Sequence, residues 1–247
     1  NYADMRDVLS DYVGTAVNQQ LTLRGPKLPK LPDIQLRAAT PVEVSRIRGD
    51  WERIQIDFVR KSFPSAVPKY VDQARRTLRK AYDAGERDPH LQAVLGLLEC
   101  DLQDYEAAAP FLEVAVKAGI TRPRVYYELG LQRYYVAIKG SPDGFLSESQ
   151  RESILAPLLK GRSQPPLIAG NFALLADVWL RSKAPIPGAE LQQINRASEL
   201  FPYHPSVVVR AAELNLKYGH VDLADRQLQR LLPLVTNEST RDVIRHR

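Results

Sequence analysis

The side chains most often used in catalysis or metal binding are sparse in this sequence. The chain has four histidines, His90, His204, His220 and His246, and none has a further ligand at the spacing of a zinc motif such as H-E-x-x-H. Three of them fall at expected turns between helices, which favours turn or capping roles. The single cysteine, Cys100, cannot form an internal disulfide and lies in an apolar helical pattern, which indicates a small buried side chain. We therefore expect no metal site.

Motifs for nucleophilic catalysis and phosphate binding are missing from the sequence as well. Asp143-Gly144 and Gly161-Arg162 lack the Lys-Ser/Thr that completes a phosphate loop, and no G-x-S-x-G elbow occurs. Glu148 and Glu152 stand four residues apart on an expected helix, but on its exposed side, so nothing would raise the pKa of either carboxyl. The sequence predicts a protein that is not an enzyme and needs no cofactor.

The charge balance is mildly basic. The chain has 34 Lys and Arg against 29 Asp and Glu, a net charge of +5, and the two signs interleave. The densest basic cluster, Arg75, Arg76, Arg79 and Lys80, is either a solvated helix face or a phosphate-binding patch. Nucleic-acid binders usually show a stronger bias and a recognisable motif, so we do not expect a nucleic-acid partner. Charges also interrupt every apolar stretch before the roughly 20 residues that a membrane span needs.

A repeat with a period of about 34 residues organises the chain. The recurring positions are Ala74, Leu78 and Ala81 with Ala108, Leu112 and Ala115; Leu95-Gly96 with Leu129-Gly130; and Ile194 and Ala197 with Leu228 and Leu231. Three independent matches at one shift indicate stacked copies of one structural unit.

Each unit is predicted to be a pair of helices. Residues His90 to Asp101 carry apolar side chains at helical spacing, and Tyr105 to Ala118 do the same. Asp104 between them is a typical N-cap, because its carboxylate can accept from free N–H groups at a helix start. Gly119 stands where a left-handed residue commonly ends a helix.

On these residues the sequence resembles the tetratricopeptide repeat (TPR) family, in about five divergent repeats. The shared pattern is an aromatic residue, Leu-Gly and a second aromatic in the first helix, then Ala, a large apolar residue and Ala in the second helix. The resemblance implies an all-α fold, a right-handed solenoid of antiparallel helix pairs. It also implies small residues where the helices cross, which are Gly96, Gly130, Ala176 and Ala212.

The repeats are expected over residues 42–235, with the Trp51–Ile54–Phe58 helix paired to Val71–Tyr82 in the first one. Ahead of them, residues 1–22 are predicted to form a helix and residues 23–41 a proline-rich extended linker. Residues 236–247 are expected to be a tail or a short helix.

Two insertions and two prolines depart from the repeat pattern. A turn cluster at residues 140–144 lies within an insertion at residues 138–145, and a second proline-rich turn lies at residues 184–188. Pro110 and Pro157 fall inside expected second helices, where each removes one backbone donor and is expected to bend the helix.

In such an array we expect binding on the concave face, which the first helices line. Glu52 and Ile56 are expected to line it in the first repeat. The further predicted lining residues are Leu97, Asp101, Arg124, Tyr127, Leu131, Tyr134, Tyr135, Asp177 and Arg181. The tyrosines are interpreted in three ways: as a peptide-binding hot spot, as side chains packed between repeats, or as a groove filled by the chain's own Leu28–Leu36 segment.

The preferred function is a non-catalytic scaffold that binds a protein or peptide. The first alternative is the C-terminal accessory domain of a larger bacterial envelope hydrolase, for example a zinc peptidase, because the resemblance includes such arrangements and a start at Asn1 suggests a fragment or a processed product. The second alternative is a weak nucleic-acid binder. The sequence indicates a soluble protein of the bacterial cytoplasm or envelope and specifies neither its compartment nor its oligomeric state.

Overall fold

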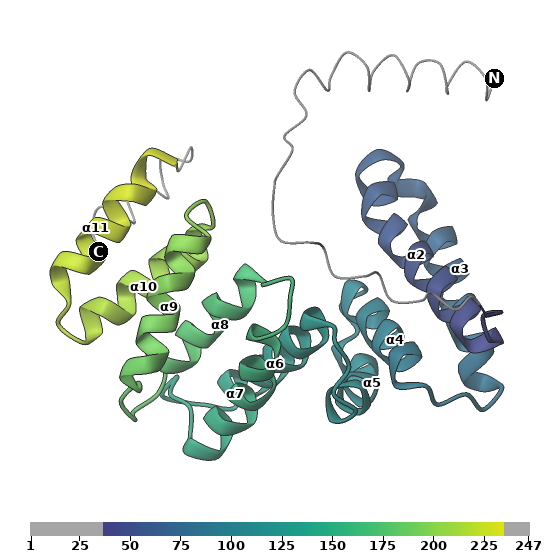
Figure 1. Ribbon diagram of the computed structural model, residues 1–247, viewed down its shortest axis with the longest axis horizontal. Coiled ribbons are helices and arrows are strands. Elements are labelled where there is room, and N and C mark those ends of the chain that lie inside the picture. Colours follow the sequence, from purple (N-terminus) through teal and green to yellow (C-terminus); the bar gives the residue numbers. More distant parts are fainter. Residues whose placement is uncertain (1–36, 235–247) are drawn as a thin grey trace, which may run out of the picture. The chain divides into compact units, whose positions relative to one another are not determined.

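The computed structural model describes residues 37–234, and this part of the chain consists of helices joined by turns and short loops (Figure 1). The α-helices are α2 (Pro41–Ser62), α3 (Val67–Asp83), α4 (Pro89–Asp101), α5 (Tyr105–Lys117), α6 (Pro123–Lys139), α7 (Glu148–Arg162), α8 (Ala169–Leu180), α9 (Gly188–Leu200), α10 (Pro205–Lys217) and α11 (Val221–Leu231). Two short 3-10 helices, η1 (Pro64–Ala66) and η2 (Leu232–Leu234), complete them. Within residues 37–234, strand-like pairing is limited to one isolated bridge, Leu146 to Ser182. The predicted all-α class is confirmed.

Several predictions fall outside these residues. They concern the helix at residues 1–22, residues 23–36 of the linker at 23–41, the Leu28–Leu36 segment, the tail at 236–247 and His246.

Local side-chain chemistry sets the helix starts. Thr40 and Glu43 form a reciprocal capping box at the start of α2: the Thr40 hydroxyl accepts from the Glu43 N–H, and the Glu43 carboxylate accepts from the Thr40 N–H at 2.8 Å. The predicted N-cap Asp104 accepts from the Ala107 N–H at 3.1 Å. Gly119 follows α5 with a φ of +71°, as predicted for a left-handed residue at a helix end.

The helices pack in chain order. The closest pairs are α2 with α3, α4 with α5, α6 with α7 and α10 with α11, and each first helix also contacts the next first helix along the chain. The exception is α8, which packs more extensively against α10 than against its expected partner α9. The proline-rich turn predicted at residues 184–188 lies in the connection between α8 and α9 and runs into the first residue of α9.

Glycine lets the paired helices approach closely. A Cβ built on Gly96 would lie 2.7 Å from Cδ2 of Leu112, and one built on Gly130 would lie 2.7 Å from Cγ of Leu158. Real side chains do not approach this closely, so a larger residue would have to push the leucine aside. The predicted placement of both glycines at helix crossings is confirmed.

Helices α2 and α3 pair as predicted, but the side of α2 that is buried differs from the predicted one. Trp51, Ile54 and Phe58 point to solvent, whereas Glu52 and Ile56, predicted to line the groove, are buried. The reason is that α2 turns Gly49 toward α3, where Leu78 occupies the space that a Cβ would need. A helix that buries Gly49 must expose the opposite side.

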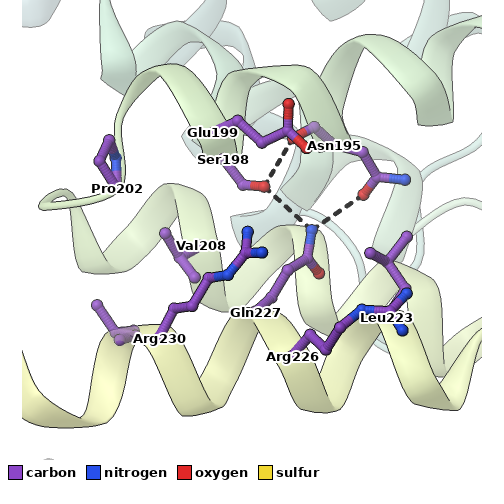
Figure 2. A pocket seen from close by; sticks show the side chains of 10 residues that line it. Asn195, Ser198, Glu199, Pro202, Val208, Leu223, Arg226, Gln227 and Arg230 are labelled. Atoms are coloured by element: carbon purple, nitrogen blue, oxygen red, sulfur yellow. Dashed lines mark hydrogen bonds between the residues drawn. The ribbon is translucent and has the colours of Figure 1, made fainter.

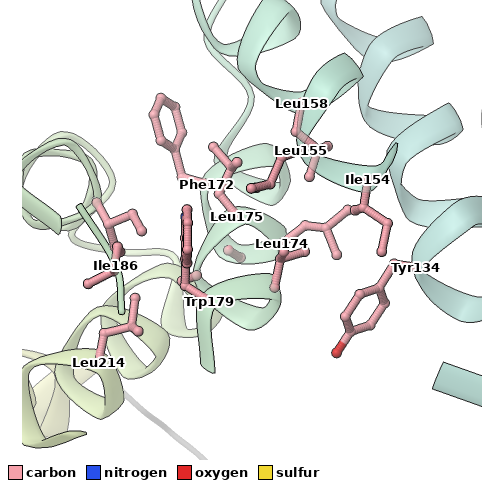
Figure 3. Packing of buried hydrophobic residues seen from close by; sticks show 14 of the residues in the cluster. Tyr134, Ile154, Leu155, Leu158, Phe172, Leu174, Leu175, Trp179, Ile186 and Leu214 are labelled. Carbon is pink, nitrogen blue, oxygen red and sulfur yellow. The ribbon is translucent and has the colours of Figure 1, made fainter. Parts of the chain in front are cut away.

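The core runs along the array as successive clusters of side chains. In the largest cluster, Leu174, Leu175 and Trp179 of α8 lie among side chains from α6, α7 and α10 (Figure 3). Pro110 and Pro157 lie within α5 and α7, and both helices continue past them. The expected insertion at residues 138–145 begins inside α6, which ends only at Lys139.

Candidate peptide-binding surface

Charged side chains from three consecutive first helices meet on the predicted binding face. Arg53 of α2 donates to Asp101 of α4 at 2.6 Å, and Arg124 of α6 bonds the other oxygen of the same carboxylate. Arg124 also pairs with Glu128 at 3.1 Å, one helical turn further along α6. Asp101 therefore ties α2, α4 and α6 together.

A second acidic group extends this network. Asp50 of α2 accepts from Arg53 at 3.0 Å and from Arg122, just before α6, at 2.6 Å. The side chains of Arg53 and Asp101 are almost fully buried. Removing one member of such a buried network leaves a charge without its partner, which is costly even where the intact network contributes little.

Burial shifts the proton affinities in this network. Burial raises the pKa of Glu128, and the nearby Arg124 guanidinium offsets only part of that shift. For Arg124, burial acts to lower the pKa, but attraction to Asp101 and Glu128 outweighs it and the pKa is raised. The raised pKa of Arg124 keeps its guanidinium charged. The raised pKa of Glu128 makes its carboxyl easier to protonate than that of an ordinary glutamate.

A matching set of contacts joins the later first helices. Arg210 of α10 pairs with Asp177 of α8 at 2.7 Å and with Glu213 at 2.6 Å. Arg181, which follows α8, donates to the hydroxyl of Tyr134 of α6 at 2.8 Å. Burial raises the pKa of Asp177 despite the two arginines beside it. Like the first network, this one holds neighbouring helix pairs in register.

A lysine side chain binds the C-terminal end of α8. The ammonium group of Lys217 donates to the carbonyl oxygens of Trp179, Leu180 and Ser182 at 3.0–3.1 Å. These carbonyls lie at or just beyond the end of α8, where the helix no longer supplies a full set of N–H partners, so a positive charge is favourable there. Burial lowers the pKa of Lys217.

Tyrosine rings supply the accessible part of this face. Tyr135 of α6 is 59% exposed, and Tyr105 at the start of α5 is also exposed. Tyr127 packs over Gly170, where a Cβ would lie 3.1 Å from its hydroxyl oxygen. Burial, followed by the negative charge of Glu128, raises the pKa of both Tyr105 and Tyr127. We call Tyr105, Tyr127 and Tyr135 the tyrosine patch.

The structure brings some of the predicted lining residues together and buries others. Asp101 lies against Arg124, and Tyr134 lies against Arg181, as described above. The prediction that Leu97 lines the groove is wrong, because its side chain is fully buried between α4, α5 and α6. Tyr134 is also buried, so its ring belongs to the core and only its hydroxyl meets Arg181.

Leu131 is intermediate between these two outcomes. Its side chain is partly buried and packs against the largest core cluster, which includes Tyr134. Leu131 therefore contributes to the core as well as to the predicted face.

Three lining residues are not indicated by the sequence pattern, namely Arg53, Arg210 and Tyr105. Tyr105 is missed because it begins a second helix, whereas the repeat pattern assigns only first helices to the groove. Arg53 and Arg210 form ion pairs with residues on other helices. No local pattern reveals such partners, although an arginine beside a buried helix face is itself a weak signal.

The basic cluster predicted as a solvated face or a phosphate patch is partly engaged within the chain. Arg75 and Arg79 both pair with Glu99, whose side chain is buried. The guanidinium of Arg79 also lies 5.2 Å from the ring centre of Phe111. Arg76 and Lys80 remain exposed on α3.

A separate cavity of about 370 Å³ opens between α9, α10 and α11 (Figure 2). Its floor is a polar network in which Gln227 donates to Asn195 at 3.2 Å and to Ser198 at 3.0 Å. Both amide hydrogens of Gln227 are therefore used internally. The side chains that remain at the rim are chiefly Arg226 and Arg230, with Glu199 opposite them.

Other chemistry has little support in the part of the chain that is described. Residues 37–234 hold no group of three or more His, Cys, Asp and Glu side chains able to bind a metal ion. Burial raises the pKa of Cys100 to about 12, so its thiol stays protonated. Among the described helices, none has both the length and the apolar character needed to cross a membrane.

Comparison with protein-family models, with curated proteins and with solved structures finds no match to this chain.

Proposed function

We propose that this chain is a non-catalytic scaffold that binds a protein or peptide on the inner face of a TPR-like array, a right-handed solenoid of antiparallel helix pairs. Two observations support the architecture. Successive helices pack as pairs, and each first helix also contacts the next one. Gly96 and Gly130, one repeat apart, each admit a leucine from the second helix of their own pair.

One observation carries the proposed binding role: the exposed rings of Tyr105 and Tyr135, with the partly buried Tyr127, lie beside charges that already have partners within the chain. Arg53, Arg124 and Arg210 are each paired with carboxylates of this chain, so they are poorly placed to hold a carboxylate of a ligand. The tyrosine patch instead offers stiff apolar area with polar tips, which is typical of interface hot spots. The favoured ligand is therefore a segment with apolar or aromatic side chains and few charges.

Selection of peptides from a random displayed library tests this proposal and requires no identified partner. Peptides selected on the whole chain would be measured for their dissociation constants. Tyr135→Ala should weaken binding by about 30-fold or more, the effect of a hot spot worth about 2 kcal/mol. Tyr203→Ala is the matched control, because Tyr203 is an exposed tyrosine in the turn between α9 and α10. Equal loss in both variants, or none in either, would count against the tyrosine patch.

A further inference from the structure

Helix α2 exposes a stripe of apolar side chains and, beside Gly49, Ile56 and Val59, buries two charged ones. The side chains that it buries include the charged residues Glu52 and Arg53. Its exposed large apolar side chains are Val44 (52%), Ile47 (59%), Trp51 (65%), Ile54 (55%) and Phe58 (66%). We call these five residues the α2 stripe. A buried charge is informative, and so is a contiguous exposed apolar surface, and α2 has both.

The spacing of the α2 stripe is that of a coiled-coil seam. Its members follow one another at alternating intervals of three and four residues, the a and d positions of a heptad. A seam of this kind packs best against another helix with the same spacing, crossing at about 20°. Among the described helices, α2 itself carries such an exposed series, so a second copy supplies the matching surface.

The size of the α2 stripe fits a dimer interface. Residues of these types have full accessible areas on the order of 150–250 Å², so the exposed fractions leave roughly 600 Å² of accessible surface on each copy. This equals the largest apolar patch of a typical monomer. Two copies together would remove roughly 1,200 Å² from water before any flanking contact is counted, which is the lower end of stable interfaces.

The charges beside the α2 stripe do not oppose self-association. Arg48 pairs with Glu52 at 2.9 Å, and Asp57 pairs with Arg60 at 2.9 Å. Asp50 pairs with Arg53 and with Arg122, as described above. A second copy would therefore meet flanks on which these charges are already paired within the chain, and the further flanking charges, Glu43 and Lys61, are of opposite sign.

We propose that a second copy of this chain covers the α2 stripe, with α2 packed against α2 across a two-fold axis. Trp51 is the middle member of the stripe: in an antiparallel pair centred on the stripe it lies at the axis, and in a parallel pair it faces its own copy across the axis. This surface is separate from the tyrosine patch, and the proposal does not depend on peptide binding there.

The test is the molar mass of the whole chain in solution, measured by sedimentation equilibrium up to about 100 µM. Interfaces of about 1,600 Å² bind in the micromolar range or tighter, and the α2 stripe with its flanking contacts approaches that size, so a dimer is expected within this concentration range. Trp51→Glu places a charge at the centre of the seam and should raise the dissociation constant by about 100-fold or more. Tyr203→Glu changes an aromatic residue outside the stripe that is more exposed than Trp51, and it should leave the dissociation constant unchanged.

Two results would overturn the proposal. A wild-type chain that stays monomeric at every concentration would assign the α2 stripe to a different occupant. A Trp51→Glu variant that dimerises like the wild type would place the interface elsewhere. Circular dichroism should show that the variant keeps its helices. If it does not, the same measurement on Ile47→Glu, one helical turn before Trp51 in the stripe, tests the proposal in its place.

Discussion

Replacing Gly130 with alanine tests whether close helix contact holds the array together. Gly130 lies in the middle of α6, and its missing side chain leaves room for Leu158 of α7, which is fully buried. The new Cβ would lie 2.7 Å from Leu158 Cγ. Because Leu158 is enclosed by the core, it cannot turn away freely, and either the helices or the leucine must shift.

The expected magnitude is a balance of two effects. Alanine favours helix over glycine by about 1 kcal/mol. Overpacking a well-packed core costs about 1–3 kcal/mol, and the enclosed Leu158 places this site in the upper part of that range. Gly130→Ala should therefore lower the free energy of unfolding by about 1–2 kcal/mol, and Gly130→Leu by about 2–5 kcal/mol.

Urea denaturation followed by circular dichroism measures this change. Gly188→Ala is the matched control, because Gly188 begins α9 and a Cβ built on it meets no atom within 4 Å. That variant should be unchanged or stabilised by up to about 1 kcal/mol. If Gly130→Ala proves as stable as Gly188→Ala, glycine at the crossing is not what allows the close approach, and the reasoning is refuted.

Two further predictions concern the charged network of the inner face. Asp101→Asn should lower the free energy of unfolding by about 2–3 kcal/mol, because the buried Arg53 loses one carboxylate partner, whereas Asp57→Asn in an exposed pair should change it by less than about 0.5 kcal/mol. Urea titrations of both variants measure these changes, and an equal loss of unfolding free energy in the two variants would contradict the prediction. The raised pKa of Glu128 means that the folded state holds its proton more tightly than the unfolded state, so the contribution of this group to stability falls as pH rises above the ordinary glutamate pKa of about 4.3. In thermal melts, the melting temperature of Glu128→Gln should rise relative to that of the wild type across that pH range, and the difference should stop changing above the raised pKa. A difference in melting temperature that does not change with pH would contradict the raised pKa of Glu128.

Much of the local structure could be predicted because its causes lie within a few residues. The helix expected at His90 to Asp101 is observed as Pro89–Asp101, and Asp104 and Gly119 cap α5 as predicted. A cap depends on a hydrogen bond to a backbone group two or three residues away, and a left-handed turn depends on the residue that adopts it. Such features are legible in a short window of sequence.

The long-range pairings could not be predicted in this way. Arg53 and Asp101 are 48 residues apart along the chain, and their ion pair requires α2 and α4 to lie at a particular distance and rotation. Leu97 shows the same limit: its position on the helix suggested the groove, but close packing of α4 against α6 buries it. A repeat pattern indicates which residues correspond, but not how tightly neighbouring units approach.

The sequence by itself determined that the described chain is helical, where α4 and α5 begin and end, and that Gly96 and Gly130 lie at helix crossings. The tertiary structure alone decided which side of α2 is buried. Trp51 and its apolar neighbours suggested one face, yet the contact between Gly49 and Leu78 and the ion pairs of Arg53 turned the helix the other way. Hydrophobicity indicates that a face will be covered, whereas the partner that covers it is set by the shape and charge of the neighbouring helices.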